Sequence, residues 1–473
     1  MMKKYNKYNV AMMLGVSVLL TSCLAVKDYK QPTVKETSKE VYRVEGEQIK
    51  QTDTVSMASV SWKTMFTDAY LQAYVEEALE NNFDLQIAIK QMESAESYLK
   101  QGKAAFLPTF SIGASLNDQE VSKNSRFGSL SANRSIQTYE LSGNLSWEAD
   151  IWGKIRSGKR ASLASYLQSE AAQQAVRTEL VARIVRAYYQ LLALDAQLEI
   201  TNQTIAVRKK GVETIKALKE SGQVNQVAVD QNIAQYNNAE ALKIDLEASI
   251  FQLENSLSIL LGTTPRKFER SELSKQAIDT DMQIGIPALL LSNRPDVKSA
   301  QYALMQNFEM KNVAKTNLYP SLTLTASGGF QALEVDKWLT GNSIFASIIG
   351  GITQPIFNQR KLKTQLEVAK NNEEQALLNY RKALLVAGSE VSNALYAYQA
   401  ETSKFVFRAK EAEALSNAEI NSEELLNNGY VTYLDLLTAR QSALSAKLNL
   451  VDSKLQQLLT VVDLYKALGG GVK

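Results

Sequence analysis

The chain carries one pattern of residues twice, far apart in the sequence. KAAFLPTFSIGASL begins at Lys103 and KTNLYPSLTLTASG begins at Lys315, and in each a proline precedes alternating apolar and small polar residues. Pro108 and Pro320 differ by 212 positions (320 − 108). Ordered matches at one offset predict a tandem duplication, which restricts the fold to two copies of one unit. The same offset pairs Asn81 with Asn293, Asp84 with Asp296, Ala88 with Ala300, and Ala114–Ser115 with Ala326–Ser327.

A second series of matches lies nearer the C-terminus. Gly222 and Gly429 differ by 207 positions (429 − 222), five fewer than in the first series (212 − 207), which is the size of a loop change. The same offset pairs Val224 with Val431, Asp245 with Asp452, and Leu261–Gly262 with Leu468–Gly469. We therefore divide the chain into a leader at 1–22, an N-terminal segment at 23–66, a first repeat at 67–286 and a second repeat at 287–473.

Each repeat is predicted to contain very long helices, because proline is scarce and helix-favouring residues are abundant. At 1.5 Å rise per residue, the longest would extend on the order of 100 Å. Helices of that length normally stack side by side in coiled-coil fashion. The predicted helices are Asp68–Gly102, Ile155–Glu220 and Val224–Leu261 in the first repeat, and Pro287–Thr316, Leu362–Asn427 and Tyr433–Leu468 in the second.

The repeated proline pattern predicts β-strands. Phe106–Leu116 and Leu318–Ser327 alternate apolar with small polar residues, and their prolines stand at strand starts, where a missing N–H is tolerated. A partner strand is predicted at Tyr139–Glu148, and a fourth near Ser343–Thr353 is apolar on both faces. The strands of a soluble β-sandwich would also alternate apolar with polar residues. Strands of roughly 10 residues are, however, long enough to cross a bilayer at a tilt, and no further strands are available for a sandwich.

Four strands cannot close a barrel with a useful lumen. An open sheet in lipid would leave edge N–H and C=O groups unsatisfied, each at a cost of several kcal/mol. We therefore expect several chains to pool their strands. Eight, twelve or sixteen strands would all satisfy this requirement.

The N-terminus resembles a bacterial lipoprotein signal. Lys3 and Lys4 precede an apolar run at Val10–Leu20, and small residues then lead to Cys23, the only cysteine. In such signals the cysteine is acylated, for example with palmitate, and becomes the mature N-terminus. Leu24 rather than aspartate follows, which favours the outer membrane. The alternative is an ordinary cleaved signal with an unrelated thiol.

Composition argues against an enzyme. The chain has no histidine, which excludes Ser-His-Asp and Cys-His catalysis and any His-ligated metal site. A formal net charge of +2 gives no strong basic field for nucleic acid. We expect no cofactor, no metal and no nucleic-acid partner.

Several stretches, read together, resemble the TolC-like outer-membrane factors, in particular their OprM-like lipoprotein branch. The resemblance covers nearly the whole mature chain. It rests on LSWEADIWGKIR at Leu145–Arg156, ITQPIF at Ile352–Phe357, NNFDL at Asn81–Leu85, YLDLL at Tyr433–Leu437 and LYKALGG at Leu464–Gly470.

The resemblance implies a mainly α protein with a membrane β-barrel. Three identical chains would contribute four strands each to a twelve-stranded barrel in outer-membrane lipid, and their long helices would form a periplasmic α-barrel. This homotrimer would be a passive duct, docked on a periplasmic adaptor and an inner-membrane pump of the RND type, that exports small molecules. The alternatives are the duct of a type I protein secretion system and a periplasmic coiled-coil adaptor lipoprotein without a pore.

The resemblance also places two tight turns, Gly222–Val227 and Gly429–Leu434, at the periplasmic tip, where the gate and adaptor contacts lie. Asp435 matches an aspartate that rings the entrance, whereas Thr438 replaces a second one. Alternatively, Asp435 is a first-turn aspartate that complements the helix dipole. The implied tip residues are Gly222, Val224, Gly429, Val431, Thr432, Tyr433, Asp435 and Thr438.

Other conspicuous side chains receive structural interpretations. The tyrosines at 188, 189, 396 and 398 are predicted to pack between helices, and Arg208–Lys210 to form a solvated helix face. Asp150 and Arg156 are predicted to pair at the junction between strand and helix.

Overall fold

The computed structural model describes residues 26–34, 61–126, 129, 135–276 and 294–470. Cys23, the leader and the predicted boundary between repeats at 286–287 lie outside these residues. The chain forms two compact units. The sheet unit takes residues 1–32, 92–168 and 300–379, and the helical unit takes 33–91, 169–299 and 380–473. Both halves of the sequence contribute to each unit.

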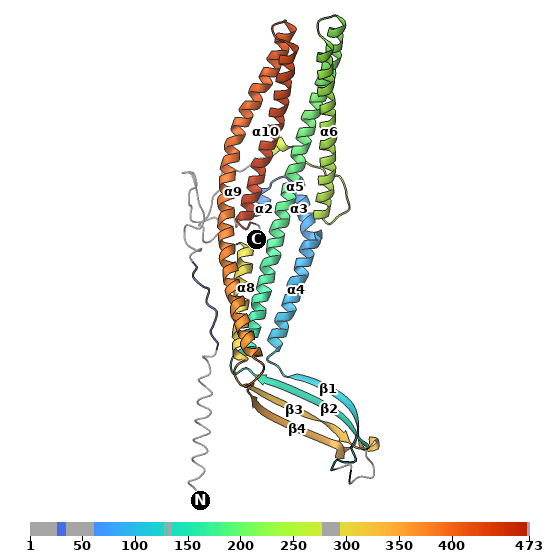
Figure 1. Cartoon of the computed structure of the whole chain (residues 1–473), viewed down its shortest axis with the longest axis vertical. Helices are drawn as coiled ribbons and strands as arrows, with labels where there is room; N and C mark the ends of the chain where they lie inside the picture. The colour runs from blue at the N-terminus through green and yellow to red at the C-terminus, as the bar shows by residue number, and fades with distance from the viewer. Residues whose placement is uncertain (1–25, 35–60, 127–128, 130–134, 277–293, 471–473) are drawn as a thin grey trace. The chain divides into compact units, whose positions relative to one another are not determined.

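The sheet unit contains one antiparallel sheet in the order β1-β2-β3-β4 (Figure 1). Pro108 and Pro320 directly precede the first residues of β1 and β3, so their missing N–H groups lie outside the ladders. The strands are β1 (Thr109–Glu120), β2 (Ser135–Ala149), β3 (Ser321–Ala332) and β4 (Ile344–Thr353).

The helices confirm the predicted duplication in their lengths and offsets. Helices α5 (Lys154–Glu220) and α9 (Lys361–Asn427) have 67 residues each and start 207 positions apart (361 − 154). Helices α6 (Gln226–Leu260) and α10 (Tyr433–Ala467) have 35 residues each and the same offset (433 − 226). The remaining elements are α2 (Trp62–Met65), α3 (Ala69–Asn81), α4 (Phe83–Ala104), α8 (Pro295–Thr316) and the short 3₁₀ turns η4 (Leu273–Lys275), η5 (Val335–Lys337) and η6 (Gly341–Ser343). None of the helices in the described residues is both long and apolar enough to span a membrane.

The prediction of one continuous helix at Asp68–Gly102 was wrong, because the chain breaks at Asn82 between α3 and α4. Asn82 Oδ1 accepts from the Leu85 N–H at 2.9 Å and starts α4, while its Nδ2 donates to the Leu260 carbonyl at 2.9 Å. The second half repeats the latter contact, since Arg294 Nη1 donates to the Ala467 carbonyl at 2.9 Å. The two donors are 212 positions apart (294 − 82) and the two acceptors 207 (467 − 260). In each half, the residue that precedes α4 or α8 therefore binds a carbonyl at the C-terminal end of that half's last helix.

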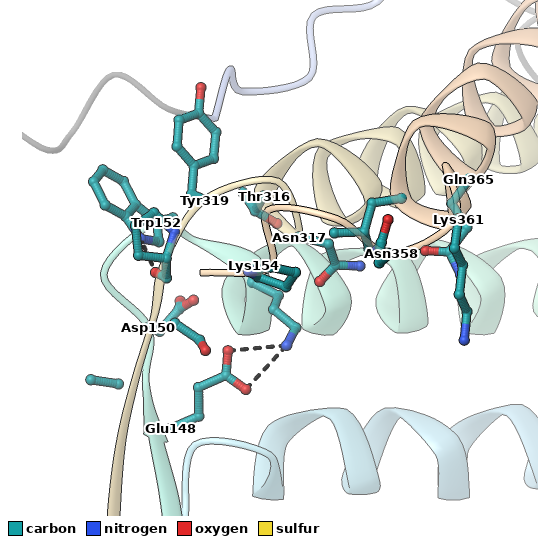
Figure 2. A pocket seen from close by; sticks show the side chains of 15 residues that line it. Glu148, Asp150, Trp152, Lys154, Thr316, Asn317, Tyr319, Asn358, Lys361 and Gln365 are labelled. Carbon is teal, nitrogen blue, oxygen red and sulfur yellow. Dashed lines mark hydrogen bonds and ion pairs between the residues drawn. The ribbon is translucent and has the colours of Figure 1, made fainter. Parts of the chain in front are cut away.

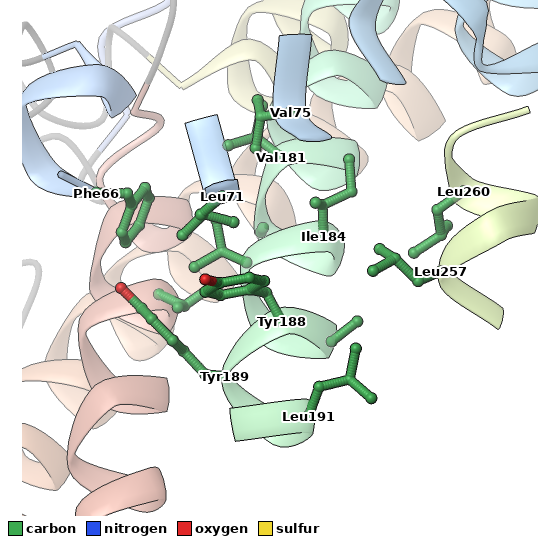
Figure 3. Close-up of a cluster of buried hydrophobic side chains, with 14 of the residues drawn as sticks. Phe66, Leu71, Val75, Val181, Ile184, Tyr188, Tyr189, Leu191, Leu257 and Leu260 are labelled. Atoms are coloured by element: carbon green, nitrogen blue, oxygen red, sulfur yellow. The ribbon is translucent and has the colours of Figure 1, made fainter. Parts of the chain in front are cut away.

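The helical unit has one apolar core, built from α3, α5, α6 and α10 (Figure 3). Leu71 and Val75 of α3 are fully buried, as is Ile184 of α5. Burial of each such side chain contributes roughly 1.5–3 kcal/mol to the stability of the fold. Tyr188 and Tyr189 lie in this core, which confirms their predicted packing role.

Two predictions about polar and aromatic side chains of the helices were wrong. Tyr396 is 62% exposed and therefore does not pack between helices, although Tyr398 packs partly buried against the core. Arg208 is only 7% exposed, because its guanidinium turns inward to reach acceptors on α6 and α10. Only the next two residues of the run, Lys209 and Lys210, form a solvated face.

Candidate functional site

The register of the sheet separates its two faces by chemistry. On one face, every row from Ala149 to Leu116–Tyr139–Ala332 consists of apolar, aromatic or glycine residues, and only the two rows at the far end, Asp118–Gln137 and Glu120–Ser135, are polar. Examples of these rows are Phe110–Leu145–Ala326–Ile348, Trp147–Leu324–Gly350 and Ala114–Leu141–Phe330–Ile344. The opposite face carries mainly Ser, Thr, Asn, Gln and Glu, as in the row Ser111–Asn144–Ser327–Ser347. Four strands from two halves of the chain thus align into one apolar and one polar surface.

The apolar face is not covered by the described part of the chain. Every residue of β1 is exposed, and Ile112 and Ile348 are 71% and 76% exposed. A contiguous, exposed apolar surface that extends over four strands marks a contact with lipid or with another protein. The β4 strand remains partly ambiguous, as the sequence indicated, because Phe345 and Ile349 lie on the polar face.

The ends of the sheet are tied by the same contact in both halves. The indole N–H of Trp147 donates to the Phe106 carbonyl at 2.9 Å, and the side-chain amide of Gln354 donates to the Leu318 carbonyl at 2.8 Å. The donors are 207 positions apart (354 − 147) and the acceptors 212 (318 − 106). Each half therefore ties its second strand back to the segment that leads into its first.

A pocket of about 530 Å³ opens in the sheet unit where the strands meet the starts of α5 and α9 (Figure 2). Glu148 of the polar face pairs with Lys154 at 3.0 Å. Asp150 accepts from the N–H groups of Ile155 and Arg156 at 2.8 and 3.0 Å, so it caps α5. Its carboxylate also lies 3.9 Å from the Arg156 side chain, which is the pair predicted from the sequence.

Pro320 lines this pocket and is fixed there by an aromatic side chain. The Trp152 indole donates to the Pro320 carbonyl at 2.7 Å and stacks on Tyr319 with ring centroids 5.1 Å apart. The pocket offers amides, paired charges and aromatic edges. No group of three or more His, Cys, Asp or Glu side chains able to hold a metal ion occurs in the described residues.

An N-terminal strap, residues 26–31, lies against the sheet unit. Val26 approaches Gly153, where an added Cβ would lie 3.2 Å from the valine side chain. The Lys27 carbonyl accepts from Asn312 at 3.1 Å, and Asp28 pairs with Arg160 at 2.8 Å. The strap therefore holds the start of the described chain beside the junction of β2 and α5.

The two turns of the helical unit end their helices in the same way. Gly222 and Gly429 have φ of 76° and 77°, a conformation that glycine adopts without strain. In each turn the following residue donates its N–H back to a helix carbonyl, from Gln223 to Leu218 and from Tyr430 to Leu425, both at 2.9 Å. Asn225 and Thr432 then cap α6 and α10.

Asp435 forms part of the cap at the N-terminus of α10. Its carboxylate accepts from the Thr432 N–H at 2.8 Å and from the Thr432 hydroxyl at 2.6 Å, while its own N–H bonds back to that hydroxyl. The hydrogen bonds from the side chain and the backbone of Thr432 hold the pKa of Asp435 below its ordinary value. The carboxylate is therefore ionised near neutral pH and remains exposed.

The other predicted tip residues serve different purposes. Val224 and Val431 are half-buried, and Thr438 is exposed, with its hydroxyl donating to the Leu434 carbonyl at 2.9 Å. Tyr433 donates to Asn232 and so links α10 with α6. Val227, Tyr430 and Leu434 lie within the two predicted turns but were not named as individual tip residues, and they are 60%, 80% and 58% exposed. Their signal was an apolar residue beside a helix-ending turn.

The sequence matches the model of the outer membrane efflux protein family over residues 74–263 and 286–470. The solvent efflux pump outer membrane protein SrpC of Pseudomonas putida is 28% identical over 459 residues, which is 96% of each chain. The cation efflux system protein CusC of Escherichia coli is 25% identical, over 96% of this chain and 97% of the relative.

Solved structures agree with this match. The open state of the Neisseria gonorrhoeae MtrE outer membrane channel has a TM-score of 0.82 at 26% identity, over 95% of this chain and 98% of that one. The outer-membrane channel OprN has a TM-score of 0.83 at 24% identity, over 94% and 99%. The predictions of a TolC-like fold, and of a channel rather than an enzyme, are confirmed. The chain belongs to the outer membrane efflux protein family.

Proposed function

We propose that this chain is the outer-membrane channel subunit of a tripartite efflux system, a passive homotrimeric duct for small molecules. The observation that carries the proposal is the sheet, with one face that is apolar in all but its two end rows and is uncovered by the described chain, and with an opposite face that is mainly polar. In a closed barrel the apolar face contacts outer-membrane lipid and the polar face lines a wet lumen.

The edges of the sheet support pooling of strands between copies. Among the described residues, strands β1 and β4 each pair with one neighbouring strand, so the outer edge of each offers a row of N–H and C=O groups for a further strand. In lipid each unpaired group costs several kcal/mol, and pairing β1 of one copy with β4 of the next removes that cost. The family resemblance gives the number of copies as three, and hence twelve strands.

The strap supports a lipid anchor at Cys23. Val26 lies beside Gly153 at the β2–α5 junction. Cys23 precedes Val26 by three positions in the sequence, so the strap joins the proposed anchor to the level where the strands end and the helices begin. That level is the periplasmic border of a barrel, and lipid attached there would enter the inner leaflet.

The two turns of the helical unit support a periplasmic docking tip. Val227, Tyr430 and Leu434 offer exposed apolar contacts, and we assign them to the periplasmic adaptor together with the tip residues predicted from the sequence. Asp435 contributes one carboxylate per copy to a ring at the entrance. The relatives' names, for solvent and cation efflux, favour small-molecule cargo. The family resemblance implies that an RND-type pump delivers it.

The test compares a strain that lacks this gene with its parent and with a complemented strain. Retention of several fluorescent amphiphiles and the protein content of the medium are recorded in parallel. Retained dye with unchanged medium is the predicted result. Unchanged dye retention with secreted proteins missing from the medium would contradict the proposal and indicate a polypeptide duct.

A further inference from the structure

A buried arginine in the helical unit lacks a counter-ion within the described chain. Arg208 of α5 is 7% exposed. Its Nη1 donates to the Gln235 carbonyl and its Nη2 to Gln441 Oε1 at 2.8 Å, and both acceptors are neutral. Among the described residues, Arg208 forms no ion pair. Because a buried charge needs a partner of opposite charge to offset its desolvation, this arrangement is incomplete.

A second arginine adds to the excess of positive charge. Arg440 of α10 is mostly buried, and its Nη2 lies 3.1 Å from Glu423, whose side chain is 53% exposed. Within the described chain, Arg440 Nε donates no hydrogen bond. Burial, together with the positive charge of Arg440, lowers the pKa of Arg208. The two guanidinium groups therefore repel each other between α5 and α10, where little water reaches them.

A cavity of about 130 Å³ adjoins both guanidiniums, lined by residues of α5, α9 and α10. Lys447 also lines it and pairs with Glu419 at 3.3 Å. Three cations thus face two carboxylates, Glu419 and Glu423, which leaves one positive charge uncompensated. About 10–15 Å³ of such space holds one water molecule, so the cavity is large enough for a polyatomic anion.

We propose that this cavity binds a small oxyanion of the carboxylate or phosphate class, held by Arg208, Arg440 and Lys447. Guanidinium groups bind such oxygens through paired N–H donors, and Arg440 has the Nε donor to spare. The bound oxygens would supply the missing negative charge between α5 and α10. The anion comes from solution, or its oxygens belong to an acidic side chain of a second copy of this chain.

The first arm measures the Tm of the detergent-purified full chain in sodium phosphate and in sodium chloride at equal ionic strength. A ligand that binds only the folded state raises Tm in a saturable manner. We expect phosphate to raise Tm by several degrees over chloride. Arg440→Gln and Lys447→Gln should each reduce this gain. Lys209→Gln removes the same charge from an exposed neighbour on α5 and should leave the gain unchanged.

The second arm locates the oxygens directly and does not depend on the variants folding. Tungstate is added, and its density or anomalous signal is sought between Arg208 and Arg440 in a structure of the assembled protein. Tungstate there, with the phosphate gain, identifies an anion from solution. A neighbouring copy's carboxylate there, without a phosphate gain, identifies the other source. Water alone between the arginines, with no phosphate gain, would overturn the proposal. None of these measurements involves export, so they succeed or fail independently of the proposed function.

Discussion

Asp68 shows how one carboxylate joins distant parts of the helical unit. It caps α3 by accepting from the N–H groups of Tyr70 and Leu71 at 2.9 and 3.2 Å. Its second oxygen accepts from Ser271 and, at 2.8 Å, from Gln276. Burial alone would raise the pKa of Asp68, but the hydrogen bonds from Ser271, Gln276 and Leu71 outweigh burial and lower it.

Asp68→Asn should therefore destabilise the protein in a pH-dependent way. A folded-state pKa below the unfolded value of about 3.9 gives stability that is present above pH 4 and lost as pH falls through the folded pKa. The loss in Tm caused by the substitution should be largest at pH 7 and shrink towards pH 3. Asp245→Asn, on the exposed side of α6, is the control and should change Tm little. A loss that is equal at pH 7 and pH 3 would refute the role of the ionised carboxylate.

Gln359 and Arg360 both adopt positive φ, 56° and 64°, just before α9. The first half has Gly153 at the position equivalent to Arg360 (360 − 153 = 207), with φ of 79°. Gln359→Gly should raise the free energy of unfolding by about 1 kcal/mol, since the relief of left-handed strain, roughly 1–2 kcal/mol, exceeds the added backbone entropy of glycine in the unfolded chain. Gln365→Gly, inside α9, should lower it by about 1 kcal/mol. Tm measurements that give both substitutions the same sign would contradict this account.

At the scale of elements, the sequence allowed the long helices to be placed almost to the residue. The starts of α5, α6, α9 and α10 fall within two residues of the predictions. For α6 and α10 this accuracy has a local cause, because Gly222 and Gly429 end the preceding helices through their own backbone conformation. The break at Asn82 has a local part, the cap on the Leu85 N–H, and a non-local part, the bond to the Leu260 carbonyl far along the chain, which the sequence does not reveal.

The sequence predicted where the strands lie and which face of each is apolar, but it did not predict the register that pairs residues across the strands. Alternation in β1 and β3 predicted the apolar side. The β4 strand stays partly ambiguous, because its register places Ile348 beside Ala326 on the apolar face but Ile349 on the polar face. The burial of Arg208 was not predictable, because a charge run on a helix does not reveal which neighbours it will meet. The equivalent hydrogen bonds of Trp147 and Gln354 are made by different residue types in the two halves, so their equivalence is visible only in the structure.

Ile348→Arg and Ser347→Arg place the same charge on opposite faces of β4. On the proposed lipid side, an arginine near the bilayer midplane would cost about 2–4 kcal/mol, whereas on the proposed lumen side it would remain hydrated. We expect Ile348→Arg to reduce the yield of assembled protein in outer-membrane fractions, and Ser347→Arg to assemble normally. Equal yields, measured on unheated gels, would contradict the assignment of the faces.

At the scale of the assembled molecule, Asp435 combines a structural and a proposed functional role. Its capping box stabilises the start of α10, typically by about 1 kcal/mol, and its exposed ionised carboxylate is available to a ring formed by the copies. The Thr438 hydroxyl, bonded to its own helix, offers no second charge.

If Asp435 lines the entrance as proposed, Asp435→Ala should lower the cation-over-anion permeability ratio, because the substitution removes one carboxylate per copy. The reversal potential in planar bilayers under a salt gradient measures this ratio. Asp452→Ala removes an exposed carboxylate farther along α10 and should leave it unchanged. If Asp435→Ala does not move the reversal potential, Asp435 is only a helix cap.

The most direct test of the proposed channel is to label the two faces of β1 in the membrane. Ile112→Cys and Ser111→Cys lie on the apolar and the polar face, and the chain's single natural cysteine, Cys23, is the proposed acylation site. We predict that a fluorophore at Ile112→Cys is quenched by spin-labelled lipids, whereas Ser111→Cys reacts with a water-soluble maleimide and escapes lipid quenching. Equal quenching at both positions, or the reverse pattern, would contradict a lipid-facing apolar surface and with it the barrel.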